Sequence, residues 1–255
     1  MTDALPRPIA FTMLGGPSVL IEYAGARFLI DPTFDAPGEY PIGTRALTKL
    51  VGPALGPDEV GPVDAVLLSH DQHPDNLDRA GRQFLTGVPL VFTTTLAATR
   101  LEGPARGLTP WESTTVGDVT VTAVPAQHGP DGCEELTGPV IGFVLSAGGA
   151  STIYVSGDNA SLAVVREVAT RFPDIGIAVL FAGAARTALI DGFLTLQSQE
   201  AVEAARLLGN PRVIPVHTDG WGHFTEDGSV LRAEFARAGT AALLVDTTPG
   251  VRIVL

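Results

Sequence analysis

Five histidines are the residues whose type and placement could do chemistry in this sequence of 255 residues. Four of them lie at or just past the ends of short apolar runs that are typical of β-strands. Strand ends place side chains along a shared edge that a rigid sheet holds in position, and neutral imidazole is a common metal ligand. This placement predicts a metal site drawn from His70, His73, His128 and His217, and His223 is the fifth histidine.

The densest group lies in residues 69–78, which read Ser-His-Asp-Gln-His-Pro-Asp-Asn-Leu-Asp. Imidazole and carboxylate groups occur together here, and they are the usual ligands of zinc and related divalent ions. Pro74 stiffens the loop, so fewer conformations are lost when an ion binds. A lone histidine is more often structural than a ligand, but this clustering favours metal binding by His70 and His73.

Apolar and alternating runs predict the strands that position these groups. They cover residues 10–14, 18–23, 27–31, 64–69, 89–93, 119–125, 140–146, 152–155, 177–181, 212–216, 241–245 and 251–255. Helices are predicted over 95–101, 161–172, 198–208 and 229–238, the second capped by Asn159. Strands dominate the first half, and strands alternate with helices in the second. This order indicates two sheets packed face to face with helices outside.

Residues 35–62 are rich in proline and glycine and show no clear periodicity. We predict a long loop with a short helix over 44–51, and a loop of this length in a compact domain is often functional. Phe34 and Tyr40 are candidates for substrate contact, with a plain surface loop as the alternative. Asp78 is predicted to cap a helix.

Composition limits the function further. The formal net charge of -12 and a pI of about 4.7 disfavour nucleic acids and anionic membranes as partners, because like charges repel. The one cysteine, Cys133, allows neither an intramolecular disulfide nor a cysteine-based zinc cluster. The first residues lack signal-peptide features, and no apolar run approaches the ~20 residues of a membrane span. We expect one domain over residues 1–255, located in the cytoplasm.

The sequence resembles the metallo-β-lactamase superfamily and, within it, the metal-dependent hydrolases similar to the ascorbate-6-phosphate lactonases. The likeness covers nearly the whole chain, through Ser18–Tyr23, residues 29–32, the His70 loop, His128, Ser156-Gly157-Asp158, His217 and residues 221–224. This resemblance implies an α+β fold. It is a four-layer αββα sandwich in which two mixed β-sheets are flanked by helices.

The motif of that superfamily is H-x-H-x-D-H, whereas this chain reads H-x-x-H-x-D-N. With a one-residue gap at Gln72, the resemblance implies His70, His73 and Asp75 as ligands and places Asn76 at the third histidine. Without the gap, Gln72 would take a ligand position and Asp75 would fall out of register. The later ligands implied by the resemblance are His128, Asp158 as a bridging carboxylate, and His217.

The implied ligands divide into two metal sites. The first would hold an ion with three imidazoles and Asp158, which leaves a position open for catalysis. The second keeps Asp75, Asp158 and His217, but Asn76 is a weaker ligand than imidazole. We therefore expect zinc, as one or two ions, and manganese is an alternative for the second site.

Three other positions bear on the site. Gly15-Gly16-Pro17 stands where many members of the lactonase-like branch, which the sequence resembles, carry a histidine. Asp31 is a candidate for orienting a ligand imidazole, and a turn cap before a proline explains it equally well. Ser156 is not in a G-x-S-x-G elbow, which disfavours serine hydrolase chemistry.

The expected chemistry is attack by a metal-activated hydroxide on a small ester, lactone, amide or phosphodiester. Asp75 and His223 are the predicted catalytic residues: Asp75 passes a proton to the leaving group, and His223 contacts the substrate or its oxyanion. Packing of His223 beside Trp221 is the alternative. Two other functions stay open, a small-molecule phosphodiesterase and a catalytically weak metal-binding or ligand-sensing protein. The expected partner is a small-molecule substrate, and a homo-oligomer stays open.

Overall fold

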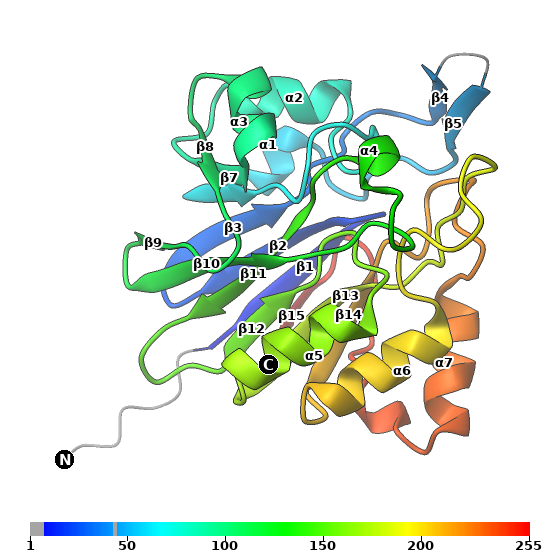
Figure 1. Ribbon diagram of the computed structural model, residues 1–255. Coiled ribbons are helices and arrows are strands. Elements are labelled where there is room, and N and C mark those ends of the chain that lie inside the picture. Colours follow the sequence, from blue (N-terminus) through cyan, green and yellow to red (C-terminus); the bar gives the residue numbers. More distant parts are fainter. Residues whose placement is uncertain (1–7, 43–44) are drawn as a thin grey trace.

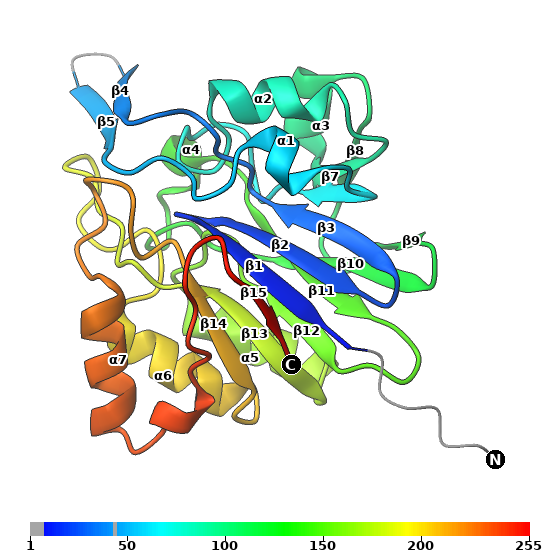
Figure 2. The same cartoon turned by 180° about the vertical axis from the view of Figure 1, so that it is seen from behind.

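Two β-sheets stacked face to face form the centre of the computed structural model, which describes residues 8–42 and 45–255 (Figure 1). Helices cover the outer faces of the sheets (Figure 2), so the layers run helix, sheet, sheet, helix. This arrangement confirms the predicted α+β class and the αββα sandwich. The core between the sheets contains buried side chains of both, among them Phe11, Phe28, Phe143 and Val179.

Within the described residues, the first sheet contains seven strands in the order β15-β1-β2-β3-β6-β7-β8. Neighbouring strands from β15 through β1 and β2 to β3 are antiparallel. Neighbouring strands from β3 through β6 and β7 to β8 are parallel, so the sheet is mixed. Its outer face packs on α1 and α2 through Val60 and Leu85. The strands are β1 (Ala10–Gly15), β2 (Ser18–Tyr23), β3 (Ala26–Ile30), β6 (Ala65–Leu67), β7 (Val91–Thr94), β8 (Ala105–Leu108) and β15 (Arg252–Val254).

The second sheet, in the same part of the chain, has six strands in the order β14-β13-β12-β11-β10-β9. Strands β12, β13 and β14 are parallel and the other pairs are antiparallel. Its outer face packs on α5, α6 and α7 through Val165, Ala201 and Phe235. The strands are β9 (Ser113–Val116), β10 (Val119–Pro125), β11 (Ile141–Ser146), β12 (Thr152–Val155), β13 (Ile175–Phe181) and β14 (Arg212–Val216).

A separate hairpin projects beside the sandwich and consists of β4 (Gly38–Ile42) and β5 (Arg45–Lys49). In the described ranges, no helix is both long and apolar enough to cross a lipid bilayer. The helices are α1 (Pro57–Val60), α2 (Arg79–Leu85), α3 (Thr95–Leu101), α4 (Glu134–Thr137), α5 (Leu162–Arg171), α6 (Ser198–Leu207), α7 (Gly228–Arg237) and the 3₁₀ turn η1 (Ala241–Leu243).

Four strands deliver candidate ligands. His70, His128 and Asp158 follow the ends of β6, β10 and β12, and His217 directly follows β14. These strands are apolar runs buried on both faces, as expected in the middle of a covered sheet. The buried strands thus fix the backbone up to the residues before each polar side chain.

The predicted short helix over 44–51 is wrong. Arg45–Lys49 form β5, and Thr44 lies outside the described residues. A contact distant in sequence overrides the local preference, because buried Lys49 places its Nζ 2.8 Å from Asp78 Oδ2. Asp78 also accepts a hydrogen bond from Gly81 N at 2.8 Å, so it caps α2 as predicted.

Two smaller predictions are also wrong. Helix α5 begins after Ser161, whose Oγ accepts from Val164 N at 3.4 Å. Asn159 does not cap it, because Asn159 Oδ1 accepts from Gln127 N at 3.1 Å and so ties two loops together. Residues 241–245 form η1 and one isolated bridge to β14 instead of a strand.

Candidate metal centre

Four side chains converge at the ends of β6, β10 and β12. The Nε2 atom of His70 lies 2.8 Å from Nδ1 of His73, and Nε2 of His128 lies 3.2 Å from that same Nδ1. Asp158 Oδ2 lies 3.4 Å from His128 Nε2 and 4.0 Å from His70 Nε2. One potential ligand atom of each residue lies within 4.8 Å of all the others, a spacing that suits a single ion.

Hydrogen bonds on the far sides of two rings fix their tautomers. Ser69 Oγ donates to Asp31 Oδ2 at 2.7 Å, so it accepts from Nδ1–H of His70 at 2.9 Å. His128 Nδ1 lies 2.8 Å from the carbonyl oxygen of Leu194, which can only accept. Both rings therefore carry their proton on Nδ1 and present an unprotonated Nε2 to the cluster, as metal-binding imidazoles do.

Burial keeps the rings of His70 and His73 neutral. Burial and then the neighbouring rings lower the pKa of His70 well below its ordinary value, and burial and then His128 lower the pKa of His73. Neutral imidazole is the form that binds a metal. Asp158 Oδ2 is buried and has no hydrogen-bond partner among the described residues. A cation would satisfy both this oxygen and the crowded nitrogen lone pairs, so the donor set fits a divalent ion.

A second cluster shares Asp158 with the first. Asp75, Asp158 and His217 also place one potential ligand atom each within 4.8 Å of the others. His217 Nε2 lies 3.1 Å from Asp75 Oδ2 and 3.5 Å from Asp158 Oδ1. His223 approaches the same cluster, with Nε2 3.0 Å from Asp75 Oδ2. The predicted ligands and His223 are thus brought together around one shared carboxylate.

Opposite charges dominate the electrostatics of this second cluster. Burial opposes the ionisation of Asp75, but His223 and His217 outweigh it and hold the pKa of Asp75 well below its ordinary range. Burial likewise opposes protonation of His217, but Asp158 and Asp75 outweigh it and raise the pKa of His217. Asp75 is therefore an ionised carboxylate, which is a suitable ligand for a divalent ion.

His217 has a backbone conformation that is uncommon for a residue with a side chain, with φ of 58°. Its N–H donates to the carbonyl of Gly16 at 2.7 Å, and its own carbonyl packs against Gly183. A Cβ added to Gly183 would lie 2.0 Å from that carbonyl oxygen. The surrounding backbone therefore holds His217 in this conformation, which is how strain persists at a functional site.

Gly183→Ala is expected to displace His217, because the new methyl group would overlap its carbonyl oxygen. We expect a loss of roughly 1–3 kcal/mol in the free energy of unfolding, the usual cost of overpacking, together with reduced metal retention. Urea unfolding and metal analysis measure these effects. Gly148→Ala is the matched control, since nothing lies within 4 Å of its added Cβ. Equal behaviour of the two variants would rule out this role for Gly183.

Asn76, at the position of the third histidine, lies between two carboxylates. Its Nδ2 donates to Asp31 Oδ2 at 3.0 Å and to Asp158 Oδ1 at 3.2 Å. Carboxylates only accept, so the NH₂ group must face them. Asn76 therefore orients the shared carboxylate through its nitrogen, while its buried Oδ1 has no partner among the described residues.

Asp31 acts on the first cluster indirectly, through neighbouring side chains. It contacts His70 through Ser69 and also accepts from Asn76, so it orients an imidazole indirectly. Burial, opposed by hydrogen bonds from Asn76 and Ser69, raises the pKa of Asp31 to about 7.

The side chain of Gln72 lies against Gly138, and its Oε1 accepts from the backbone N–H of Asp71.

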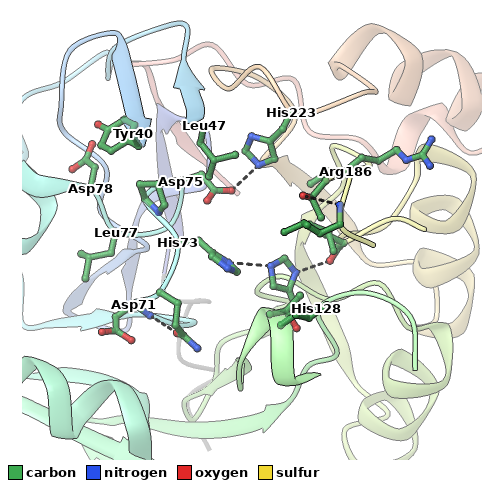
Figure 3. A pocket seen from close by; sticks show the side chains of 18 of the residues that line it. Tyr40, Leu47, Asp71, His73, Asp75, Leu77, Asp78, His128, Arg186 and His223 are labelled. Atoms are coloured by element: carbon green, nitrogen blue, oxygen red, sulfur yellow. Dashed lines mark hydrogen bonds and ion pairs between the residues drawn. The ribbon is translucent and has the colours of Figure 1, made fainter. Parts of the chain in front are cut away.

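A cavity of about 580 Å³ opens above the two clusters, and His73, Asp75, His128 and His223 are part of its lining (Figure 3). Tyr40 also lines the cavity, with its hydroxyl donating to Asp35 at 2.6 Å. Phe34 is not part of the lining, because it is buried with its ring 5.2 Å from that of Phe84. The volume is in the range of sites that enclose a small molecule.

Sequence reasoning missed some of the residues that position this centre. Ser69 could have been found, since a hydroxyl next to a ligand histidine is a frequent hydrogen-bond partner of its ring. The carbonyl of Leu194 has no such signal, because it reaches His128 from 66 positions away along the chain. The apolar cavity residues Leu136 and Leu189 lie outside the strands and helices that the sequence predicts.

A four-layer sandwich with histidine and carboxylate clusters at its strand ends defines the class of metallo-β-lactamase-fold proteins. A family model described as the beta-lactamase superfamily domain matches residues 26–218, and the chain therefore belongs to this superfamily. A UPF0173 metal-dependent hydrolase of Methanosphaerula palustris is 28% identical over 190 residues, covering 71% of this chain and 80% of the relative. One from Carboxydothermus hydrogenoformans is 27% identical over 250 residues, covering 96% and 99%.

Solved structures give the same fold. An isothiocyanate hydrolase from Delia radicum gut bacteria superposes with a TM-score of 0.84 at 23% identity, covering 96% of this chain and 98% of that one. A possible metal-dependent hydrolase from Veillonella parvula gives a TM-score of 0.84 at 19% identity, covering 96% and 99%. Superfamily membership, with relatives named as metal-dependent hydrolases, confirms the predicted enzyme class.

Proposed function

We propose that the chain hydrolyses a small ester, lactone or amide with the help of divalent metal at the cavity floor. The observation that carries the proposal is the convergence of neutral imidazole nitrogens and an unpartnered carboxylate oxygen beneath the cavity. Zinc is the expected metal, with manganese as the alternative for the second site. The first ion would be held by His70, His73, His128 and Asp158, and the second by Asp75, Asp158 and His217.

A divalent ion bound here supplies a water whose pKa is lowered toward ~7, and it polarises the oxygen of the electrophile. The residues around it orient and move protons. Ser69 and the carbonyl of Leu194 hold the rings of His70 and His128 in the tautomer that faces the cluster.

Asp75 and His223 are the proposed catalytic residues. His223 Nε2 and Asp75 Oδ2 are 3.0 Å apart at the cavity, and both line it (Figure 3). Asp75 can accept a proton and pass it to the leaving group, while the imidazole of His223 can donate to the developing oxyanion. Trp221 lies beside His223, with ring centroids 6.3 Å apart, and this contact orients the imidazole.

Metal removal tests the proposal. The assay uses nitrophenyl esters, small lactones and anilides with zinc- or manganese-loaded protein. We expect hydrolysis to fall at least ~10²-fold after chelation and to return when the metal is restored, since several kcal/mol of transition-state stabilisation depend on the ion. Tight metal binding with no turnover of any compound would instead favour the ligand-sensing alternative. Absence of metal binding would overturn the proposal.

Asn76→His tests how many ions the site retains. We expect the native protein to keep about one ion per chain after dialysis, because the second cluster has fewer protein ligands and the amide nitrogen of Asn76 faces its carboxylate Asp158. An added imidazole should raise retention toward two ions. Mass spectrometry of metal and protein measures this ratio. Retention of two ions by the native chain would contradict the expectation and make Asn76 compatible with a complete second site.

The finer assignments rest on the same proposal. We infer membership of the branch similar to the ascorbate-6-phosphate lactonases, supported by the segment from His217 to His223 that lies against Asp75. We also infer one domain over residues 1–255, supported by pairing of β1 with β15 from opposite ends of the chain. A cytoplasmic location and a homo-oligomer stay predictions.

A further inference from the structure

The cavity wall facing the candidate metal centre is largely apolar. Its apolar members come from the β4–β5 hairpin, from the loop before α2, from α4 and from the loop between β13 and α6. Leu136 and Leu189 stand out because each is 65% exposed and both line this cavity, and exposed apolar side chains gathered in one place mark a binding site. They lie on different segments that line the same cavity. The apolar wall residues include Pro41, Leu47, Leu77, Leu136, Leu189 and Ile190.

Two of the cations that line the cavity already have partners. Arg82 donates through Nη2 to the carbonyl oxygen of Asp71 at 2.6 Å. The guanidinium of Arg79 lies over the ring of Tyr40, 4.7 Å from its centroid. Both residues are exposed, and these contacts hold their guanidinium groups against other protein groups and not against the histidine and aspartate clusters.

The third cation is directed elsewhere. The guanidinium of Arg186 lies 5.0 Å from the ring centroid of Phe193, and Figure 3 shows it extending away from His73 and His128. Among the cavity side chains that the structure describes, none of these three guanidinium groups makes a hydrogen bond or ion pair to the histidine and aspartate clusters. The apolar part of the wall favours an apolar chain over a charged group, because burying an unpaired charge costs free energy.

We propose that the substrate is an uncharged ester, lactone or amide with an apolar chain, and that Leu136 and Leu189 contact that chain. This inference rests on the proposed hydrolysis, because it names the substrate class of the same site. It places phosphodiesters, which are anionic, outside the substrate range. The leucines would act on specificity, since burial of each methylene favours binding while the reacting carbonyl stays the same.

A series of nitrophenyl esters tests chain length and charge on metal-loaded protein. From acetate through butyrate to hexanoate, kcat/KM is expected to rise about threefold per methylene. The adipate half ester, with a terminal carboxylate on a chain of the same length, should be at least about tenfold poorer than hexanoate. A flat series, or a preference for the charged ester, would overturn the proposed substrate class.

The double variant Leu136→Ser/Leu189→Ser tests the two side chains. Its kcat/KM for hexanoate is expected to fall about tenfold while that for acetate changes less than about twofold, because only the longer chain reaches them. Leu96→Ser is the matched control, since Leu96 is 53% exposed on α3 and is not part of the cavity lining. An equal loss on both esters in the double variant would contradict the assignment.

Binding of unreactive compounds separates this inference from the proposed hydrolysis. Calorimetry with methyl hexyl ketone and with the keto acid of the same length uses native protein and the double variant. We expect the ketone to bind at least about tenfold more tightly than the keto acid, and to lose that advantage in the variant. This pattern without ester turnover would leave the substrate class standing and overturn hydrolysis. Ester turnover without this binding preference would leave hydrolysis standing and overturn the substrate class.

Discussion

Asp158→Asn is expected to lower kcat/KM by about 10³-fold and to remove bound metal, since this carboxylate belongs to both clusters. Its Oδ2 lies 3.4 Å from His128 Nε2, and its Oδ1 lies 3.5 Å from His217 Nε2. Asparagine keeps the size of the side chain but offers one oxygen and no charge. Steady-state kinetics on the ester that the native protein hydrolyses, with metal analysis of the same samples, measures both effects.

Asp227→Asn is the control for this substitution. Asp227 caps α7 at the surface, where its Oδ1 accepts from Ser229 N and Val230 N. This variant also replaces an aspartate by an asparagine, but at a position outside the clusters. Its metal content should therefore be unchanged, and its kcat/KM should stay within about twofold of the native value. If Asp158→Asn keeps its metal and its rate while folding normally, Asp158 serves packing and the proposed metal sites are wrong.

Ser69→Ala is expected to weaken metal binding by about 10- to 100-fold, the usual cost of removing a group that orients a ligand. Ser69 Oγ is the link between Asp31 and the Nδ1 of His70. Without it, the buried Nδ1–H loses its acceptor, and the ring can shift its proton to the nitrogen that should face the ion. Competition with a chelator of known affinity measures the loss.

Ser161→Ala controls for a simple loss of stability. Ser161 caps α5 through Val164 N, and removing such a cap costs about 1 kcal/mol of stability. We expect its metal affinity to match the native protein even though its unfolding midpoint falls. If both serine variants bind metal equally, the link from Asp31 to His70 has no part in metal binding.

The strands and the polar groups at their ends were predictable from sequence because both signals are local. β6, β10, β12 and β14 are apolar runs, and each stops within a few residues of His70, His128, Asp158 or His217. Such runs can gain stability only inside a covered sheet, which fixes where the following side chain emerges. The structure brings these four residues together, as strand-end placement predicts for the histidines and the family resemblance implies for Asp158.

The features that sequence reasoning missed depend on contacts between distant residues. The 45–49 segment pairs as a strand because buried Lys49 contacts Asp78, and no local pattern encodes that ion pair. The role of Asn76 was unpredictable for a similar reason. As a substitute for histidine it suggested only a weak ligand, whereas the fold places its NH₂ between Asp31 and Asp158. A side chain's partners, and not its type alone, decide which of its atoms is used.

Pairing of β1 with β15 also determines when the protein can complete its fold. Arg252 on β15 contacts Glu22 across a sequence separation of 230 residues. A ribosome releases the chain from its N-terminal end, so β1 emerges long before its outer neighbour exists. Until β15 has been synthesised, the free backbone groups of β1 form an unprotected strand edge, which is a template for aggregation. Synthesis that stalls before β15 therefore leaves this edge exposed.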